Sequence, residues 1–539
     1  MPSTVFDAFA RRARQQPHAV FLCVELVTAK AYGIEAGEQR YGDALTRIHT
    51  LRDRYATAGY GHGHRAGLLL DNRPDFFAHW FALNALGVSV VPINSDLRAA
   101  ELAYLLAHSE LCLAISLPER LDDLRAAAAP GRAPVLLGLD HDGAVPAAPF
   151  AAPKAGVPIT RDSECALLYT SGTTGRPKGC VLSNDYFLLS GEWYARIGGL
   201  CTLREGRERL ITPLPLTHMN AMAYSAMAMI TTGGCLVQLD RFHPASWWAS
   251  VRESRATVAH YLGVMPAMLL GAAPSAADRD HAVHFGFGAG VDKRQQAAFE
   301  NRFGFPLLEA WAMTETGAGA VVIANHEPRH VGQSCFGRAA PDVEWRLVGE
   351  DGHDVPRGEN GELWVRTAGT DPKRGFFSEY LKDAEATAEA WADGWFHTGD
   401  LVRADAEGHL YFIDRRKNVI RRSGENISAV EVESVLAQHP AVQAVAVAAA
   451  PDAVRGDEVL ACVVLREGAS ADETTARAIT THALQQLAYY KAPGYVAFVD
   501  ALPLTVSQKV QRAQLKALAQ SLPGQSHCID TRAMKKRGA

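Results

Sequence analysis

The chain lacks the patterns that mark several special classes of protein. No two of its nine cysteines form a C-x-x-C pair, which argues against a zinc site or disulfide frame and indicates mostly buried, reduced thiols in a cytoplasmic protein. No window of about 18 uninterrupted apolar residues occurs, so we expect no membrane span. Residues 1–20 contain arginines where a signal peptide needs an apolar run. The net charge of -5 gives no sign of a nucleic-acid partner.

What is present is typical of a large soluble enzyme. The chain has 539 residues, of which 48% are hydrophobic and 21% charged. A single hydrophobic core rarely grows to serve so long a chain, so we expect two or more domains.

Helical patterns alternate with short apolar runs up to about residue 400. Residues 75–87 and 101–110 have helical spacing, whereas 88–93 and 111–116 are typical of strands. Such alternation predicts an α/β region with largely parallel strands. The weakly patterned, Ala/Pro/Gly-rich segment 126–157 is interpreted as a surface connection.

The pattern changes after residue 400. Residues 401–414 predict a β-hairpin that turns at "DAEG", and Ser428 and Glu431 have the spacing of a capping box at the start of a helix. Further strands at 441–449, 458–465 and 495–500, with a helix at 473–488, complete an α+β pattern. We therefore predict a large domain over residues 1–416 and a small one over 417–539.

The most informative motif is "YTSGTTGRPKG" at residues 169–179, which follows an apolar run. Its backbone amides and hydroxyls can form an anion-binding nest, with Lys178 as a positive charge. It is not a Walker A loop, because Gly179 follows Lys178 where that motif needs Ser or Thr. The alternative for a short Gly/Thr-rich string is a surface turn.

The whole string closely resembles the phosphate loop of the adenylate-forming enzymes: acyl-CoA synthetases, luciferases and the adenylation domains of peptide synthetases. The resemblance implies a large multi-subdomain α/β N-terminal domain with mixed and parallel sheets, followed by a small mobile α+β C-terminal domain. It also implies that the loop holds the β- and γ-phosphates of ATP. The loop residues concerned are Thr170, Ser171, Gly172, Thr173, Thr174, Gly175 and Lys178. Residues 421–465 are similar to carnitine/crotonobetaine-CoA ligases.

The resemblance extends to "EAWAMTETG" at residues 309–317. It implies that Glu309 belongs to the nucleotide site, Trp311 stacks on adenine, Thr314 binds the α-phosphate and Glu315 holds Mg²⁺. Ala312 stands where glycine is usual, and its methyl group narrows the space beside the acyl group. Without the resemblance, the tryptophan would be interpreted as part of a core turn.

Two further parts of the resemblance concern the ribose and the reacting carboxylate. Asp400 and Arg415 are expected at the open end of the predicted hairpin, where paired Cβ atoms lie about 5 Å apart and both side chains can grip a diol. A plain ion pair closing the hairpin is the alternative. The resemblance also implies that Lys509 reaches the α-phosphate and the substrate carboxylate, and that Lys417 is the hinge about which the small domain rotates.

Three further positions concern coenzyme A, the expected acceptor of the acyl group. By resemblance, Gly424 lines the tunnel for pantetheine, where a missing side chain permits close approach, and Arg421 and Arg422 meet the phosphates of CoA.

Other positions concern the acyl group. His218 lies at the mouth of the acyl pocket, and without a fixed negative charge it makes an amino acid substrate unexpected. By resemblance the pocket is lined by small residues, which suits a hydrophobic or moderately bulky acid. These are Gly288, Ala289, Gly290 and Ala312.

The sequence thus predicts a cytoplasmic AMP-forming acyl-CoA synthetase that uses ATP, Mg²⁺ and coenzyme A on a small-molecule carboxylic acid, as in fatty acid metabolism. A homodimer is left open. Two alternatives also stay open: a ligase that loads the acyl group onto a carrier protein, and a non-catalytic nucleotide-binding sensor.

Overall fold

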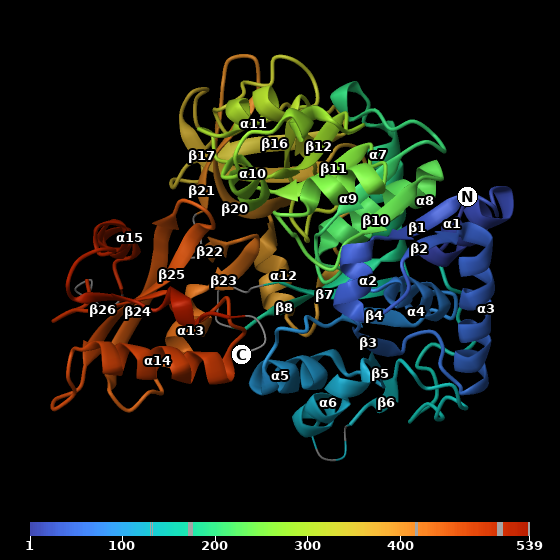
Figure 1. The fold of residues 1–539 in the computed structure, drawn as a ribbon, viewed down its shortest axis with the longest axis horizontal. Helices are drawn as coiled ribbons and strands as arrows, with labels where there is room; N and C mark the ends of the chain where they lie inside the picture. Colours follow the sequence, from blue (N-terminus) through green and yellow to red (C-terminus); the bar gives the residue numbers. More distant parts are fainter. Residues whose placement is uncertain (130, 132, 171–175, 416–418, 504–509, 537–539) are drawn as a thin grey trace. The chain divides into compact units, whose positions relative to one another are not determined.

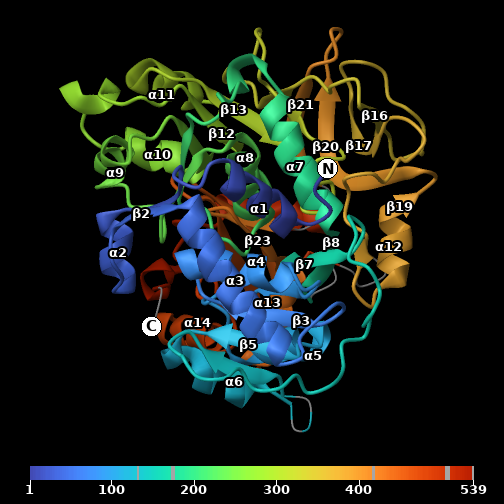
Figure 2. The same cartoon turned by 90° about the vertical axis from the view of Figure 1, so that its right-hand side faces the viewer.

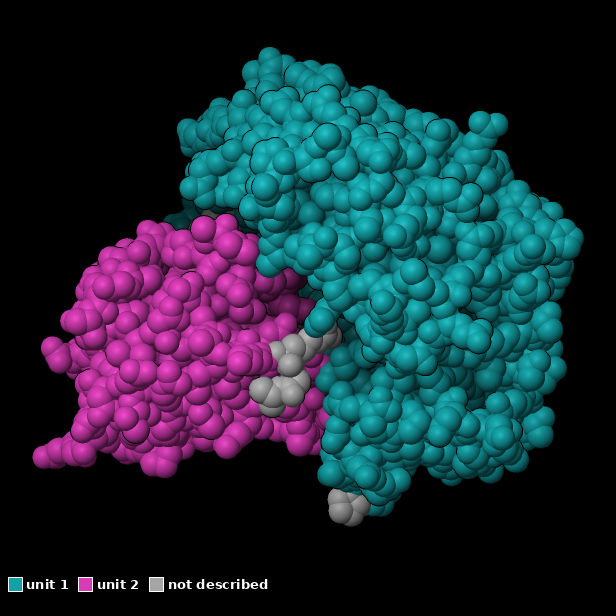
Figure 3. All heavy atoms as spheres, in the orientation of Figure 1, with its two compact units in different colours: residues 1–95, 106–169, 179–414 teal, residues 96–105, 170–178, 415–539 magenta. Residues whose placement is uncertain are grey.

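A computed structural model describes residues 1–129, 131, 133–170, 176–415, 419–503 and 510–536. The chain divides into two units, which are coloured separately in Figure 3. Unit 1 comprises residues 1–95, 106–169 and 179–414, and unit 2 comprises 96–105, 170–178 and 415–539. Both combine helices with strands (Figures 1 and 2), as the sequence predicts.

The first sheet of unit 1 has seven strands in the order β18-β8-β7-β4-β3-β5-β6. The run from β7 to β6 is parallel, whereas β18 is antiparallel to β8. The predicted helices and strands between residues 75 and 116 are confirmed. The strands are β3 (Arg65–Leu69), β4 (Ser89–Pro92), β5 (Leu113–Ser116), β6 (Val135–Gly138), β7 (Glu164–Thr170), β8 (Lys178–Ser183) and β18 (Glu379–Tyr380). The helices that alternate with these strands along the chain are α4 (Pro74–Asn84), α5 (Ala99–Ser109) and α6 (Leu121–Ala127), of which α5 has residues in both units.

Strand β6 corrects the interpretation of residues 126–157 as a connection alone. It pairs in parallel with β5, with Leu113 opposite Val135. Only Leu137 is fully buried among its four residues, because β6 is the edge strand of the sheet. An edge strand that buries one side chain has no clear periodicity in the sequence.

The second sheet has eight strands in the order β14-β13-β12-β11-β9-β10-β1-β2. Its central strands are parallel, whereas the two edge strands β2 and β14 are antiparallel to their neighbours. The strands are β1 (Val20–Val24), β2 (Gly37–Arg40), β9 (Arg209–Thr212), β10 (Cys235–Gln238), β11 (Val258–Leu262), β12 (Phe285–Ala289), β13 (Leu307–Trp311) and β14 (Val322–Ile323). The carboxyl ends of β11, β12 and β13 therefore meet at one edge, which is where parallel sheets commonly place ligands.

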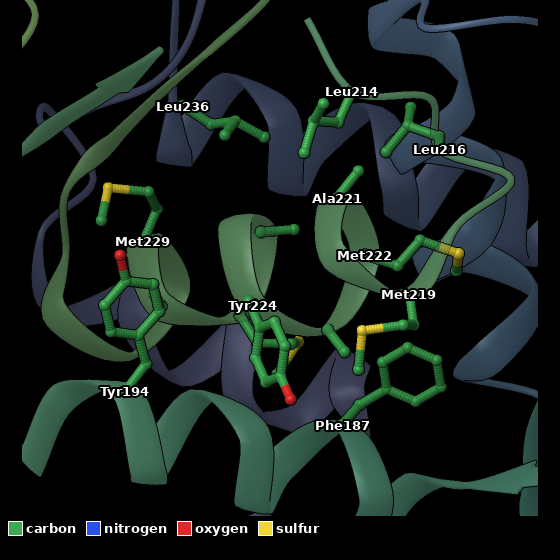
Figure 4. Close-up of a cluster of buried hydrophobic side chains, with 14 of the residues drawn as sticks. Phe187, Tyr194, Leu214, Leu216, Met219, Ala221, Met222, Tyr224, Met229 and Leu236 are labelled. Atoms are coloured by element: carbon green, nitrogen blue, oxygen red, sulfur yellow. The ribbon is translucent and has the colours of Figure 1, made fainter. Parts of the chain in front are cut away.

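Helices from distant parts of the chain share one core with both sheets. Helix α4 is apolar on every side and all its residues from Phe76 to Asn84 are buried, the pattern of an internal helix. Figure 4 shows Phe187 and Tyr194 of α7 packed against Tyr224 and its neighbours in a π-helix (Asn220–Ala226) that continues into α8. The unit's other helices are α1 (Val5–Gln15), α2 (Leu26–Tyr32), α3 (Tyr41–Thr57), α7 (Asn184–Arg196), α8 (Met227–Thr232), α9 (Trp247–Glu253), α10 (Val264–Leu270), α11 (Gln296–Phe303) and α12 (Ala384–Ala390).

An antiparallel sheet, in the order β15-β21-β20-β17-β16, completes unit 1. Its strands are β15 (Cys335–Gly337), β16 (Val343–Val348), β17 (Asn360–Thr367), β19 (Trp391–Ala392), β20 (Trp395–Ala404) and β21 (Leu410–Arg415). The hairpin predicted over 401–414 is formed by β20 and β21 and is confirmed. The Asp405 amide donates to the His409 carbonyl at 3.1 Å and closes the turn.

Unit 2 has the predicted α+β pattern. Its strands are β22 (Val419–Arg422), β23 (Glu425–Ser428), β24 (Val442–Asp452), β25 (Gly456–Leu465), β26 (Tyr495–Phe498) and β27 (Cys528–Asp530). Its helices are α13 (Ala429–Leu436), α14 (Glu473–Gln486) and α15 (Arg512–Ser521). Ser428 caps α13 by accepting from the Glu431 amide at 3.3 Å, but the Glu431 carboxylate accepts from Lys491 instead of completing a capping box.

All nine cysteines are buried, in agreement with the prediction that most of them are. Within the described part of the chain, no helix has both the length and the apolar character needed to cross a membrane.

Candidate functional site

At the carboxyl end of β13, Trp311 contacts Asp400, and the family resemblance implies that both residues bind the same nucleotide. Trp311, the last residue of β13, is 6% exposed, and its indole Nε1 donates to Asp400 Oδ2 at 2.9 Å. Asp400 lies in β20 and is 2% exposed, and its amide donates to Thr398 Oγ1 at 3.0 Å. An aromatic face and a buried carboxylate thus stand side by side, as the adenine and ribose of one nucleoside require.

Glu309, two residues earlier on β13, accepts hydrogen bonds from residues of two neighbouring segments. Its carboxylate accepts from the Tyr261 hydroxyl at 2.6 Å and from the Gly290 amide at 2.8 Å. Burial, followed by the Glu309 charge, raises the pKa of Tyr261 well above its ordinary value, so the phenol stays a donor. Glu309 therefore holds the ends of β11 and β12 together beside the predicted nucleotide site.

The segment after β13 makes a tight turn that presents Thr314 and Glu315. The Met313 amide donates to Thr316 Oγ1 at 2.9 Å, and the Gly317 amide donates to the Met313 carbonyl at 3.1 Å. The Tyr186 hydroxyl of α7 donates to the Thr314 carbonyl at 2.9 Å. Gly317 has φ +47°, and an added Cβ would come within 2.2 Å of the Tyr186 ring, so glycine is required there.

The Glu315 carboxylate is buried and oriented by a tyrosine that the sequence analysis missed. The Tyr380 hydroxyl of β18 donates to Glu315 Oε1 at 2.9 Å, and the Glu315 carbonyl accepts from the Phe377 amide at 2.9 Å. Burial and the Glu315 charge raise the pKa of Tyr380 far above its ordinary value, so the phenol remains a donor. Hard carboxylate oxygens of this kind suit Mg²⁺.

The predicted acyl-pocket glycines lie at the carboxyl end of β12, where Gly288 is opposite Tyr261 of β11. A Cβ on Gly288 would stand 2.2 Å from the Tyr261 carbonyl oxygen. Ala289 ends β12, and Gly290 follows it with φ +78°. Glycine at position 288 is thus needed for the packing of the two strands, and glycine is favoured at position 290 by its positive φ.

Strands β11 and β12 also contribute His260 and Phe287 to a buried cluster of aromatic and polar side chains. His260 is fully buried between the rings of Tyr194 and Phe287, and burial lowers its pKa to about 3. Its Nε2 lies 3.0 Å from the Tyr194 hydroxyl and its Nδ1 lies 2.7 Å from Asn220 Oδ1.

His218, the histidine predicted at the mouth of the acyl pocket, is half-buried in the segment before the π-helix. Its amide donates to the Pro215 carbonyl at 3.0 Å.

In unit 2 the predicted acceptor residues lie at one hairpin. Ser423 and Gly424 have φ of +50° and +92° between β22 and β23, which is the geometry of a type I′ turn. The Arg421 amide donates to Asp457 Oδ2 at 3.0 Å. Arg422 is 5% exposed and its Nε bonds both Glu458 oxygens at 2.9 Å, so its guanidinium is engaged within the unit.

Several predicted residues lie outside the described part of the chain. These are Ser171, Gly172, Thr173, Thr174, Gly175, Lys417 and Lys509. Thr170 ends β7 and Lys178 begins β8, so neighbouring strands flank the loop. The backbone of Arg415 ends β21, and its side chain is also outside the description. Ala312 is half-buried directly after Trp311.

Sequence reasoning missed Tyr186 and Tyr380 because no local pattern connects them with the turn. Tyr186 is 128 residues from Thr314, and Tyr380 is 65 residues from Glu315. Only the sheet that pairs β18 with β8 brings Tyr380 near the site, with Tyr380 opposite Cys180.

Comparison with known protein families matches two models. The AMP-binding enzyme model covers residues 9–373, and the AMP-binding enzyme C-terminal domain model covers residues 431–509. Since the first alone spans more than half of the chain, the class is that of the AMP-binding enzymes.

Individual relatives narrow this class. The crotonobetaine/carnitine--CoA ligases of Shigella sonnei (strain Ss046) and Escherichia coli O9:H4 (strain HS) are each 32% identical over 494 residues, which is 88% of this chain and 92% of theirs. A double mutant of the o-succinylbenzoate CoA synthetase from Bacillus subtilis superposes with a TM-score of 0.80 at 25% identity, covering 95% of this chain and 98% of its own. The amide bond synthetase McbA from Marinactinospora thermotolerans gives 0.78 at 25% identity, with 95% and 99% covered. The chain therefore belongs to the adenylate-forming AMP-binding enzymes, and among them to the family of the AMP-forming acyl-CoA ligases. The resemblance predicted from residues 169–179 and 421–465 is confirmed.

Proposed function

We propose that this enzyme activates a hydrophobic or moderately bulky carboxylic acid with ATP and transfers the acyl group to coenzyme A. The carboxylate attacks the α-phosphorus, pyrophosphate leaves, and the thiolate of CoA then displaces AMP from the acyl-adenylate. The observation that carries the proposal is the contact between Trp311 and Asp400, which unites an adenine face and a ribose acceptor within unit 1.

The turn after β13 supports the roles of Thr314 and Glu315. Glu315 is 7% exposed and oriented by Tyr380, and its carboxylate suits Mg²⁺ bound with the nucleotide. Magnesium there would offset phosphate charge. Thr314, on the same turn, is assigned to the α-phosphate.

Four further assignments complete the nucleotide site and the hinge. The loop 170–178 is assigned to the leaving β- and γ-phosphates, with Lys178 as its cation. Lys509 is assigned to the α-phosphate and the attacking carboxylate, where removing one preorganised charge typically costs about 10²–10³ in rate. Arg415 is assigned to the ribose with Asp400, and Lys417 to the hinge between the two half-reactions.

The acceptor side rests on unit 2. Gly424, in the type I′ turn, is assigned to pantetheine because a residue without a side chain permits close approach, and Arg421 is assigned to the CoA phosphates. Arg422 is assigned to the support of this hairpin through Glu458, because its guanidinium is buried there. The relatives named CoA ligases support CoA as the acceptor over a carrier protein.

The side chains assigned to the acyl pocket limit the class of acid that the enzyme accepts. Gly288, Ala289, Gly290 and Ala312 offer no charged side chain, and His218 offers no fixed negative charge for an ammonium group. We assign the enzyme to the cytoplasm.

An acid panel tests the proposal. The purified enzyme is incubated with Mg·ATP, CoA and single acids, including aliphatic, aromatic and trimethylammonium acids, and acyl-CoA is measured by mass spectrometry. At least one acid should give acyl-CoA. Acyl-adenylate that reacts only with a carrier protein or an amine would contradict CoA as the acceptor. The absence of any acid-dependent AMP release would favour the sensor.

A further inference from the structure

Three metal-ligating side chains meet in unit 1, apart from every residue discussed for the nucleotide. His330, Asp405 and His409 each offer one ligand atom, and these atoms all lie within 4.8 Å of one another. We propose that they form a zinc-binding site with three protein ligands. Imidazole nitrogen and carboxylate oxygen are both regular ligands of Zn²⁺, and a water molecule can complete a tetrahedron around three protein ligands.

Two of the ligands are fixed by the turn between β20 and β21. The His409 amide donates to Asp405 Oδ1 at 2.8 Å, and Asp405 Oδ2 lies 3.0 Å from His409 Nδ1. With metal–ligand bonds of about 2.0 Å, two ligands of a tetrahedral ion stand about 3.3 Å apart. The turn therefore holds the carboxylate and the imidazole at nearly the spacing that a shared ion needs.

The carboxylate has the supporting bond expected of a metal ligand. The Tyr411 hydroxyl donates to Asp405 Oδ2 at 2.8 Å, and such outer hydrogen bonds orient ligands in metal sites. A carboxylate has about four lone-pair positions, so these bonds leave capacity for an ion. The Arg403 guanidinium, 4.5 Å from the centre of the Tyr411 ring, is a positive charge that opposes a cation, and the Asp405 charge offsets it.

His330 supplies an independent observation. Its Nε2 is buried and has no hydrogen-bond partner among the described residues, an arrangement that costs stability unless a ligand is bound. Its ring packs edge-on against His409, with centroids 4.5 Å apart. The backbone has φ +49°, a region that residues other than glycine rarely adopt and that is often associated with function. An ion bound to the pair in the turn would give Nε2 its missing partner.

The loop that carries His330 is anchored by the residue before it. Arg329 is 8% exposed and donates to both oxygens of Glu300 at 2.8 Å. Zinc would therefore fasten this anchored loop to the tip of the hairpin, whose strand β20 contains Asp400. Since the ligand atoms lie within 4.8 Å of one another, their spacing exceeds the ideal by at most about 1.5 Å, and zinc binding would draw the side chains together by that amount.

Zinc content and thermal melting test the site. The full-length protein, without a histidine tag, is loaded with zinc sulfate and passed through a desalting column in the absence of ATP. We expect about one zinc ion per chain by elemental analysis, and a rise of about 2–5 °C in the melting temperature relative to protein stripped with a chelator. His330→Ala and His409→Ala should lose both effects.

Two control variants separate this site from other metal binding. His353→Ala removes an exposed histidine beside Asp351 in the same unit and should retain the zinc. Glu315→Gln alters the residue assigned to magnesium and should also retain it. Equal zinc content in His330→Ala and the unaltered protein would overturn the proposal.

Cobalt provides a readout that does not depend on the variants folding. Cobalt added to the unaltered protein should give the intense visible absorption of a tetrahedral site, and zinc should remove it. Zinc below about one-tenth of an equivalent together with no tetrahedral cobalt spectrum would show that the three side chains form a hydrogen-bonded cluster only.

Discussion

At the scale of single residues, the site depends on donors that orient buried carboxylates. The Glu315 carboxylate accepts a hydrogen bond from the Tyr380 hydroxyl, and the Asp400 carboxylate accepts one from the Trp311 indole. Both carboxylates are almost completely buried, where an acceptor that loses its donor is poorly compensated by water. The two donors can each be removed with little change in side-chain shape.

Tyr380→Phe removes the hydroxyl that orients Glu315. We expect kcat/KM for Mg·ATP to fall about tenfold, because a hydrogen bond to a charged group contributes roughly 1.5–3 kcal/mol. Steady-state kinetics over a range of Mg²⁺ concentrations measures this. The control is Tyr41→Phe, whose hydroxyl bonds the Met229 and Gly234 carbonyls in the core and whose loss should lower only the melting temperature. Equal effects of both variants on kcat/KM would contradict the assignment.

Trp311→Phe keeps an aromatic face but removes the indole donor to Asp400. The KM for ATP should rise about three- to tenfold with a smaller change in kcat, since a typical net hydrogen bond is worth about 1 kcal/mol. Trp248→Phe is the matched control, because that indole stacks on His281 and Phe303, and neither is assigned to the nucleotide. An unchanged KM for ATP in Trp311→Phe would separate this tryptophan from nucleotide binding.

At the scale of helices and strands, local patterns predict what lies within a segment but not what meets across the fold. The parallel strands near residue 90, the hairpin at 401–414 and the helix capped by Ser428 follow from periodicity and turn residues in the sequence. Strand β6 does not, because it buries only Leu137. The partners Tyr380 and Glu315 come together only through sheet pairing, so no spacing in the sequence predicts them.

The β22–β23 turn allows a prediction about the backbone. Gly424→Ala should destabilise unit 2 by about 1 kcal/mol, because alanine at φ +92° is strained. Ser423→Gly, at φ +50° in the same turn, should be neutral or slightly stabilising. Urea unfolding followed by hydrogen exchange in β22 and β23 checks both. A neutral Gly424→Ala would mean that the turn does not require glycine.

At the scale of the whole molecule, stability should depend on pH through a buried lysine. Lys535 is fully buried with Glu458 and Arg422, and burial followed by the Arg422 and Arg455 charges lowers its pKa to about 7, whereas Glu458 acts in the opposite direction. The ordinary pKa of lysine is 10.5. Between these values the unfolded chain holds a proton that the folded chain has released, so stability rises with pH across this window.

Lys535→Met should remove this dependence. The free energy of unfolding of the unaltered protein should gain up to about 1.4 kcal/mol per pH unit from this group between pH 7 and 9.5, and the variant should lose that contribution. Lys536→Met, at the exposed neighbouring position, is the control and should keep the slope of the unaltered protein. Urea unfolding at several pH values measures the slopes. The same slope in all three proteins would show that Lys535 stays charged when folded.

The central claim, that one site joins ATP to a carboxylic acid before the acyl group reaches CoA, is tested most directly by isotope exchange. With an accepted acid and no CoA, labelled pyrophosphate should enter ATP, and omitting the acid should abolish the exchange. Adding CoA should then yield AMP and acyl-CoA in equal amounts. Exchange that does not depend on the acid, or ADP and phosphate formed in place of AMP and pyrophosphate, would contradict the account.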